Sequence, residues 1–230
     1  MIRRGFWLII TGTGRCGTGY IAHVLNSVNI KCSHEGVFSP NHDPNGPVIP
    51  DGLVTDEEIM GRIRVRKKNP WWGWQADSSW MAAPYLERAE LEGMTIVHLV
   101  RDPKKTIDSM VRTGGFNSDI GGLFWQFQIK HMPELLETES RFERAGWFYT
   151  RWNERIERCA TLRWRVEDDV RGLLDLLDID YEGKEIFADT TYNSRAGYGP
   201  TDLNLNELPE PTLTQLQEMT ERYGYEWTSS

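Results

Sequence analysis

Near its start the chain carries the stretch that decides its fold, Phe6-Trp7-Leu8-Ile9-Ile10-Thr11-Gly12-Thr13-Gly14-Arg15-Cys16-Gly17-Thr18. Its first half is the short apolar run typical of a buried parallel strand, and the glycines that follow predict a tight turn. A helix that starts after a glycine-rich turn presents backbone N–H groups and the positive end of its dipole. The stretch therefore predicts a strand, a loop and a helix start that attract a phosphate-like anion.

A second segment repeats this arrangement further along the chain. The apolar run from Thr95 to Val100 predicts another buried strand, and Arg101-Asp102-Pro103 follows it directly. Proline is favoured in the first turn of a helix, so we expect a helix to begin at Pro103. Ser109 falls on this predicted helix, eight residues after Arg101. Two helix starts, each with an arginine, indicate a ligand that carries two separated anionic groups.

The rest of the chain alternates short apolar runs with helical periodicity. Strands are predicted at 6–11, 30–32, 71–76, 95–100 and 161–166. Helices are predicted at 18–28, at 55–67, from 79 with an interruption at Pro84, from 103, through much of 117–159, at 167–177 and at 212–223. Strands that alternate with helices indicate a parallel sheet covered on both faces. We therefore predict one domain over residues 1–230, with three α/β/α layers around a central parallel sheet.

Composition and charge argue against several classes of protein. The net charge of −8 argues against broad nucleic-acid binding, which needs a basic face, but allows a local cluster of arginines. The cysteines Cys16, Cys32 and Cys159 are odd in number and lack CxxC spacing, so neither a disulfide framework nor a zinc site is indicated. No apolar run reaches the roughly 20 residues that span a bilayer, and the first run is too short for a signal peptide. These features predict a cytoplasmic protein that binds neither nucleic acid nor membrane.

The glycine loop fits more than one phosphate-binding pattern. Gly12, Gly14 and Gly17 match GxGxxG, and Glu35 stands where a dinucleotide fold has its ribose-binding acid. The same stretch has Walker spacing, but Thr18 occupies the place of the Walker lysine. The loop alone therefore leaves two alternatives open: a P-loop kinase of nucleotides or small molecules, and a non-catalytic nucleotide-binding module of the dinucleotide type.

Taken together, the two segments resemble the sulfotransferases that use 3′-phosphoadenosine 5′-phosphosulfate (PAPS), in particular their carbohydrate-directed and bacterial branches. In that family a loop of the form Arg/Lys-x-Gly-Thr/Ser follows the first strand, and this chain has Arg15-Cys16-Gly17-Thr18. The second family motif is an arginine at a strand end with a serine eight residues later, which Arg101 and Ser109 match. Softer similarities are Arg163-Trp164-Arg165-Val166-Glu167-Asp168 on a late strand and Arg195-Ala196-Gly197 near the C-terminus.

This resemblance implies a P-loop nucleoside-triphosphate-hydrolase-like fold and transfer of a sulfuryl group to a hydroxyl or amine of a small molecule or carbohydrate. The donor's 5′-phosphosulfate is expected at residues 14–19, which are Gly14, Arg15, Cys16, Gly17, Thr18 and Gly19. Its 3′-phosphate is expected at Arg101 and Ser109, with Arg195 covering the nucleotide. PAPS is then the donor and adenosine 3′,5′-bisphosphate (PAP) the product. No metal is expected, because sulfate carries less charge than a triphosphate tail.

An acceptor hydroxyl also needs a base, and two neighbouring residues qualify. Glu35 follows the predicted strand 30–32, and binding sites lie at the carboxyl ends of parallel strands. A glutamate at this place resembles the general base of the family, so we expect Glu35 to be the base, with Arg15 as its catalytic partner on the donor. His34 is the runner-up, and we expect it to orient the substrate or the base.

For other residues we expect structural roles. Asp77, at the end of a predicted strand, is expected to cap a helix. Cys16 is expected to fill the loop as a small side chain, although a helix start can lower the pKa of a thiol. A group of aromatic residues in 117–159 is expected to wall part of the acceptor pocket: Phe124, Trp125, Phe127, Phe142, Trp147 and Phe148.

Overall fold

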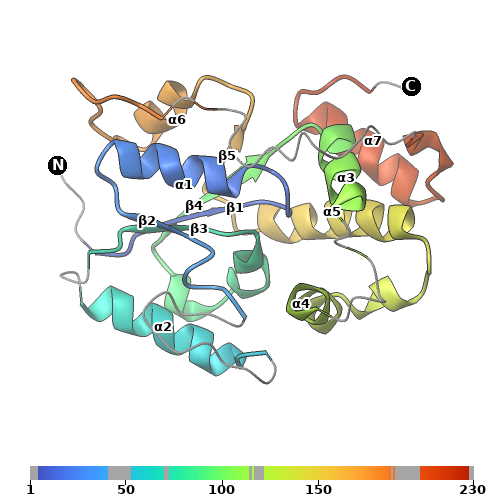
Figure 1. Ribbon diagram of the computed structural model, residues 1–230, viewed down its shortest axis with the longest axis horizontal. Coiled ribbons are helices and arrows are strands. Elements are labelled where there is room, and N and C mark those ends of the chain that lie inside the picture. The colour runs from blue at the N-terminus through green and yellow to red at the C-terminus, as the bar shows by residue number, and fades with distance from the viewer. Residues whose placement is uncertain are drawn as a thin grey trace.

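A parallel sheet of five strands forms the centre of the molecule (Figure 1). The computed structural model describes residues 5–40, 53–69, 73–113, 116, 122–187, 189 and 203–227. The strands are β1 (Leu8–Thr11), β2 (Cys32–His34), β3 (Ala76–Ser78), β4 (Thr95–Val100) and β5 (Leu162–Arg165). They lie in the order β2-β3-β1-β4-β5, and each neighbouring pair is parallel. The predicted α/β class with a central parallel sheet is confirmed.

Helices connect these strands and cover the sheet. The α-helices are α1 (Thr18–Ser27), α2 (Asp56–Lys68), α3 (Pro103–Arg112), α4 (Leu123–His131), α5 (Arg141–Glu157), α6 (Val170–Leu176) and α7 (Thr212–Arg222). Short 3-10 helices lie at η2 (Trp80–Tyr85), η3 (Ala89–Leu91), η5 (Pro133–Leu136) and η6 (Leu205–Glu207). Within the described ranges, no helix has the length and apolar character needed to cross a bilayer.

Alternating side chains of the central strands point into two separate cores. In β1, Leu8 and Ile10 belong to the core that includes α1 and α6, whereas Ile9 belongs to the core that includes α2 and α5. In β4, Val97 and Leu99 join the first of these cores. Figure 1 shows α1 and α6 on one side of the sheet and α2 on the other. Burial on both faces explains why β1 and β4 are almost continuously apolar and agrees with a three-layer arrangement.

Two strands begin later in the chain than the sequence predicts. The second strand is predicted at 30–32 and lies at Cys32–His34, and the third is predicted at 71–76 and lies at Ala76–Ser78. The side chain of Asn26 marks the start of β2, because it accepts from Cys32 N at 3.2 Å and donates to Cys32 O at 2.7 Å. The register then places Cys32 opposite Ala76 and His34 opposite Ser78. These pairings between distant segments decide the strand limits.

The segment after β3 forms the 3-10 helix η2 where the sequence predicts a helix with an interruption at Pro84. Ser79 is the N-cap of η2, and its side chain accepts from Met81 N at 3.2 Å. Pro84 lies inside η2 and has no backbone N–H to donate, which disfavours a regular α-helix. The predicted capping role of Asp77 is wrong, because Ser79 holds that position. The Asp77 carboxylate instead accepts from backbone N–H groups that follow β2.

Most of the aromatic residues that the sequence places around an acceptor pocket lie in the hydrophobic core or pack against it. Trp125, Phe127 and Phe148 are buried in the core that includes α4 and α5. Phe142 and Trp147 are partly buried against the same core. Burial of such large side chains contributes strongly to packing. Their place in the wall of an acceptor pocket stays a prediction. Phe124 differs from the rest, because it is 50% exposed.

The strand order determines where a ligand can bind. β1 lies between β3 and β4, and the carboxyl ends of all five strands share one edge of the sheet. The chain leaves β1 toward β2 on one side and later reaches β4 and β5 on the other, which makes the end of β1 a topological switch point. The order also differs from that of dinucleotide-binding folds, in which strand two lies beside strand one.

The backbone around Gly12 leaves no room for a side chain. We therefore expect a substitution at this position to lower the free energy of unfolding. A Cβ at Gly12 would overlap the carbonyl oxygen of Leu99 and lie 2.6 Å from Cys16 Sγ. Gly61, inside α2, has nothing within 4 Å of such a Cβ. Gly12→Ala should lower the free energy of unfolding by ~2 kcal/mol or more, whereas the matched control Gly61→Ala should raise it by ~0.5–1 kcal/mol. Urea denaturation measures both, and an unchanged stability of Gly12→Ala would contradict this packing.

Candidate functional site

The loop between β1 and α1 leaves the start of α1 open. Gly17 is the N-cap of α1 with a φ of 101°, and no side chain in the described part of the chain caps this helix. The first turn of α1 contains no acidic residue. The first N–H groups of a helix have no partner within it, and they point away from the helix start together with the positive end of the dipole. This geometry favours an anion at residues 14–19.

The glycines of the loop differ in backbone conformation and in the space around the position of a Cβ. Gly17 combines its left-handed φ with a tight contact, since a Cβ there would lie 2.7 Å from Val166 Cγ2. Gly14 is open by comparison, because the nearest atom to its Cβ position is Trp80 Cδ2 at 4.0 Å. Gly19 is buried in the first turn of α1. Gly14 therefore leaves space at the loop surface on the side where Trp80 lies.

Arg15 links this loop to α3. Its φ of 70° is uncommon for a residue with a side chain. Arg15 Nε donates to Ser109 Oγ at 3.0 Å, and Arg101 Nη1 donates to the carbonyl oxygen of Arg15 at 2.9 Å. The two segments that the sequence singles out are therefore joined into one group of hydrogen-bond donors at the ends of β1 and β4.

The start of α3 is closed to an anion, unlike the start of α1. Asp102 is the N-cap of α3, and its Oδ1 accepts from Lys105 N at 2.9 Å. Glu167 accepts from Asp102 N at 3.3 Å. Because two carboxylates occupy this helix end, the prediction that the second helix start attracts an anion is wrong. An anion in this region would meet the Arg101 and Ser109 side chains instead.

Tyr149 supports this group from α5, and the sequence analysis missed it. Tyr149 is 1% exposed, and its hydroxyl donates to the carbonyl oxygen of Arg101 at 2.9 Å. Burial raises the pKa of Tyr149, so the hydroxyl keeps its proton and remains a donor. The only signal in the sequence is an aromatic residue on an aromatic-rich helix. That pattern is typical of core packing and gives no hint of a contact with Arg101.

Cys16 fills the interior of the loop. It is 1% exposed, and burial raises the pKa of its thiol to about 12, although the charges of Arg101 and Arg15 act in the opposite direction. The thiol therefore stays protonated near neutral pH. A helix start does not activate this cysteine, and its predicted role as a small filler agrees with the packing.

The ends of β2 and β1 bring Thr18, His34 and Glu35 together. His34 Nε2 lies 3.3 Å from Thr18 Oγ1 and 3.6 Å from Glu35 Oε1. Glu35 has a left-handed φ of 56°, and its N–H donates to the carbonyl oxygen of Ser78 at 3.1 Å. A carboxylate and an imidazole therefore lie beside the open start of α1, as the two candidate bases require.

The surroundings of these two groups change their acid–base properties. Burial raises the pKa of Glu35 to about 7, and the Asp77 charge acts in the same direction against a hydrogen bond from Trp80 and the charge of Arg15. Burial, with a smaller effect of His23, lowers the pKa of His34. Near neutral pH, His34 is therefore uncharged and Glu35 exchanges its proton readily, which suits a general base.

Asp77 is a second buried carboxylate next to Glu35, and sequence reasoning gave it a different role. It is 0% exposed, and its Oδ1 accepts from Ser33 Oγ, from Gly36 N at 3.0 Å and from Val37 N at 3.2 Å. The sequence did contain a signal for this role, namely an aspartate at the end of a short predicted strand. Aspartate is rarely fully buried unless its carboxylate has partners.

The remaining predicted similarities lie away from this group or outside the described residues. Arg195 falls outside the residues that the structure describes. At the end of β5, Arg165 Nη1 donates to the carbonyl oxygen of Gly224 at 2.8 Å, and Glu167 accepts from Tyr225 Oη at 2.5 Å. Arg163 Cζ lies 5.0 Å from the ring centre of Tyr223. This segment therefore anchors the C-terminal part of the chain.

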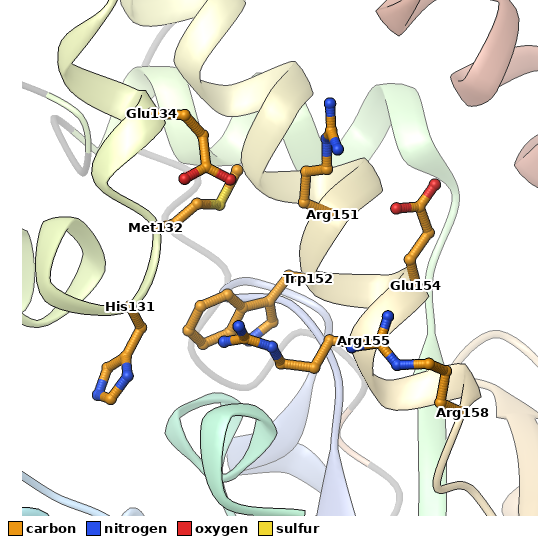
Figure 2. A pocket seen from close by; sticks show the side chains of 8 residues that line it. All are labelled: His131, Met132, Glu134, Arg151, Trp152, Glu154, Arg155 and Arg158. Carbon is orange, nitrogen blue, oxygen red and sulfur yellow. The ribbon is translucent and has the colours of Figure 1, made fainter.

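A separate cavity opens between α4, η5 and α5 (Figure 2). Its volume is about 170 Å³, and most of its lining is charged: His131, Met132, Glu134, Arg151, Trp152, Glu154, Arg155 and Arg158. Trp152 connects this cavity to the residues around Glu35, because its Nε1 donates to the carbonyl oxygen of Trp80 at 2.9 Å. The mixture of guanidinium and carboxylate groups does not correspond to the aromatic wall that the sequence predicts.

The burial of Cys16 leads to a test of the loop packing by thiol reactivity. We expect iodoacetamide at about pH 8 to alkylate the half-buried Cys159 first, and Cys16 and Cys32 at least ~100-fold more slowly. Peptide mapping by mass spectrometry distinguishes the three sites, and denatured protein is the control in which all three should react. Rapid alkylation of Cys16 in the folded protein would contradict the closed loop.

No protein-family model matches the chain, and no curated protein is significantly similar to it in sequence. A function for this chain therefore rests on the geometry of its own residues and on the motifs in its sequence.

Proposed function

We propose that this protein is a sulfotransferase that moves the sulfuryl group of PAPS to a hydroxyl or amine of a small-molecule or carbohydrate acceptor. One observation carries the proposal. The open start of α1 is joined through Arg15 to Arg101 and Ser109, and Glu35 lies at the end of β2 on the same edge of the sheet. The strand order also supports a P-loop nucleoside-triphosphate-hydrolase-like fold for the domain.

The donor's two anionic ends correspond to two parts of this group. Within residues 14–19, the N–H of Cys16 donates to the carbonyl oxygen of Thr13 at 3.3 Å, and the N–H groups at the start of α1 bind the 5′-phosphosulfate, where the dipole favours negative charge. Arg101 and Ser109 bind the 3′-phosphate, and Arg15 lies between the two ends. A guanidinium presents its N–H donors in a fixed plane that matches phosphate and sulfate oxygens, and Arg15 Nε donates to Ser109 Oγ. We expect Arg15 to contact a phosphate or sulfuryl oxygen of the bound donor from this position.

Glu35 acts as the general base, with His34 as its neighbour. The acceptor oxygen forms a new bond to sulfur while the bond between sulfur and the bridging phosphate oxygen breaks, so that PAP leaves with that electron pair. Glu35 takes the proton of the acceptor hydroxyl. His34 contacts both Thr18 and Glu35 and so connects the base to the loop that holds the donor. Backbone and side-chain donors already in place are typically worth ~3–4 kcal/mol each in the transition state.

Two features make the alternatives weaker. A P-loop kinase needs a lysine at the position of Thr18, whose hydroxyl lies 3.3 Å from His34 Nε2. In a dinucleotide fold the ribose-binding acid follows the strand beside the glycine loop, whereas β3 separates β2 from β1 in this sheet.

Calorimetric titration with PAP and with AMP, which lacks the 3′-phosphate, tests the donor site. We expect micromolar binding of PAP that weakens ~10–100-fold for AMP, because charge-assisted hydrogen bonds to the 3′-phosphate are lost. In Arg101→Ala the affinities for PAP and AMP should converge. Arg171→Ala, a change at an exposed residue of α6, is the matched control and should behave like the parent.

Magnesium-ATP and NADH belong in the same titration. A clear preference for magnesium-ATP would favour the kinase, and a preference for NADH would favour the dinucleotide-binding module. Either preference would overturn the proposed function. Equal loss of PAP and AMP binding in Arg101→Ala, with their ratio unchanged, would remove Arg101 from the 3′-phosphate site.

The pKa of Glu35 predicts how turnover depends on pH. A base works in its deprotonated form, so turnover should rise tenfold per pH unit on the acid side and level off above about pH 7. Glu35→Gln should lower turnover by ~100-fold or more with PAP binding intact, and its remaining activity should lose this pH dependence. Glu92→Gln, a change at an exposed residue, is the control and should leave turnover and its pH dependence unchanged. Unchanged turnover in Glu35→Gln would show that another residue is the base.

A further inference from the structure

The turn that carries Glu35 is held from the neighbouring strand by a single side chain. Asp77 is the middle residue of β3. Its Oδ1 accepts a hydrogen bond from the hydroxyl of Ser33, a residue that precedes Glu35 in the chain. The same oxygen accepts from Gly36 N at 3.0 Å and from Val37 N at 3.2 Å, directly after Glu35. One carboxylate oxygen therefore holds the chain on both sides of the candidate base.

The backbone of Glu35 needs such support. Its φ of 56° lies in the left-handed region, which costs free energy in a residue with a side chain. The N–H of Glu35 donates to the carbonyl oxygen of Ser78 at 3.1 Å, next to Asp77 in β3. Together with the bonds to Gly36 and Val37, this contact fixes three successive N–H groups onto β3. The direction of the Glu35 side chain is thus set by β3.

The second oxygen of Asp77 is unusual. Asp77 Oδ2 is buried and has no hydrogen-bond partner among the residues that the structure describes. A buried polar atom without a partner lowers stability, so the fold retains this carboxylate at a cost. An apolar side chain would leave Ser33 Oγ, Gly36 N and Val37 N without this acceptor, and an amide would place an NH2 group where Oδ2 lies. The three donors that Asp77 Oδ1 holds therefore account for a carboxylate at this position.

The charged and polar groups around Glu35 come from four places in the fold. They are Arg15 on the loop after β1, His34 at the end of β2, Asp77 on β3 and Trp80 on η2. Arg66 of α2 is 5% exposed, and its Nη1 lies 3.4 Å from Ser33 Oγ. Burial raises the pKa of Asp77, whereas the hydrogen bond from Ser33 and the charge of Arg66 act in the opposite direction. The negative charge of Asp77 opposes ionisation of Glu35.

We propose that Asp77 is a positioning residue for Glu35, whose carboxylate holds the turn of the base through Ser33, Gly36 and Val37. The Asp77 charge opposes ionisation of Glu35 and so makes Glu35 a stronger acceptor of protons. The inference rests on the proposed function where it calls Glu35 the base. The hydrogen-bonded clamp and the interaction between the two carboxylates exist whatever reaction the site performs. Asp77 itself contacts neither donor nor acceptor in this proposal.

The variant Asp77→Asn tests the charge, because it keeps the shape and one acceptor oxygen. NMR titration of the Glu35 side-chain carboxyl carbon, with Glu35→Gln to identify the signal, measures the midpoint directly and needs no activity. We expect the midpoint to fall by about one pH unit in Asp77→Asn. The control Glu87→Gln removes an exposed carboxylate near Arg158 and should leave the midpoint unchanged. An unchanged midpoint in a folded Asp77→Asn would overturn the proposal.

A second measurement uses the unsubstituted chain and covers the case in which Asp77→Asn does not fold. The amides of Gly36 and Val37 should exchange hydrogen with solvent at least ~100-fold more slowly than free peptides, because Asp77 Oδ1 accepts from both. Exchange at the rate of free peptides would overturn the clamp.

Kinetics separates this inference from the proposed function. If the chain transfers sulfuryl groups, the acid limb of the pH–rate profile should shift to lower pH in Asp77→Asn, by the same number of pH units as the Glu35 midpoint. If the chain transfers none, the proposed function fails, and the NMR titration alone decides on Asp77. A profile that stays in place while the midpoint moves would show that Asp77 does not act through the base in catalysis.

Discussion

The hydrogen bond from Arg101 to the carbonyl oxygen of Arg15 is the interaction on which the rest of the site depends. It ties the loop after β1 to the end of β4, where Gly12 allows the two backbones to approach closely. Arg15 has a left-handed backbone that needs support from outside the loop. With its backbone held, its side chain reaches Ser109 on α3. Two stretches far apart in the chain thereby become one binding surface.

Charge is divided across this surface along the strand order. The arginines lie at the ends of β1 and β4, whereas Glu35 directly follows β2 and Asp77 lies in the middle of β3. Trp80 stands between these halves, near Gly14 on one side and bonded to Glu35 on the other. Group transfer requires an anionic donor and a base to lie close together. Arg15 connects the two halves, because its side chain contacts Ser109 and its charge acts against the raised pKa of Glu35.

The two helix starts show how similar sequences can lead to opposite properties. Both α1 and α3 follow a buried strand, and both carry an arginine nearby. At α1 the N-cap is Gly17, which has no side chain, so the N–H groups stay available. At α3 the N-cap is Asp102, whose carboxylate occupies that end of the helix. One side chain at the N-cap thus decides whether a helix start can bind an anion.

The sequence by itself determined the class of the fold and the position of the loop. Continuous apolar runs at 6–11 and 95–100 specify strands buried on both faces, and the spacing of Gly12 and Gly17 specifies a tight turn, because both signals depend only on neighbouring residues. The tertiary structure decided the limits of β2 and β3, the contact of Arg15 with Ser109, and the role of Asp77. These depend on which residues of distant strands lie opposite one another, and a hydrophobic pattern does not encode that register.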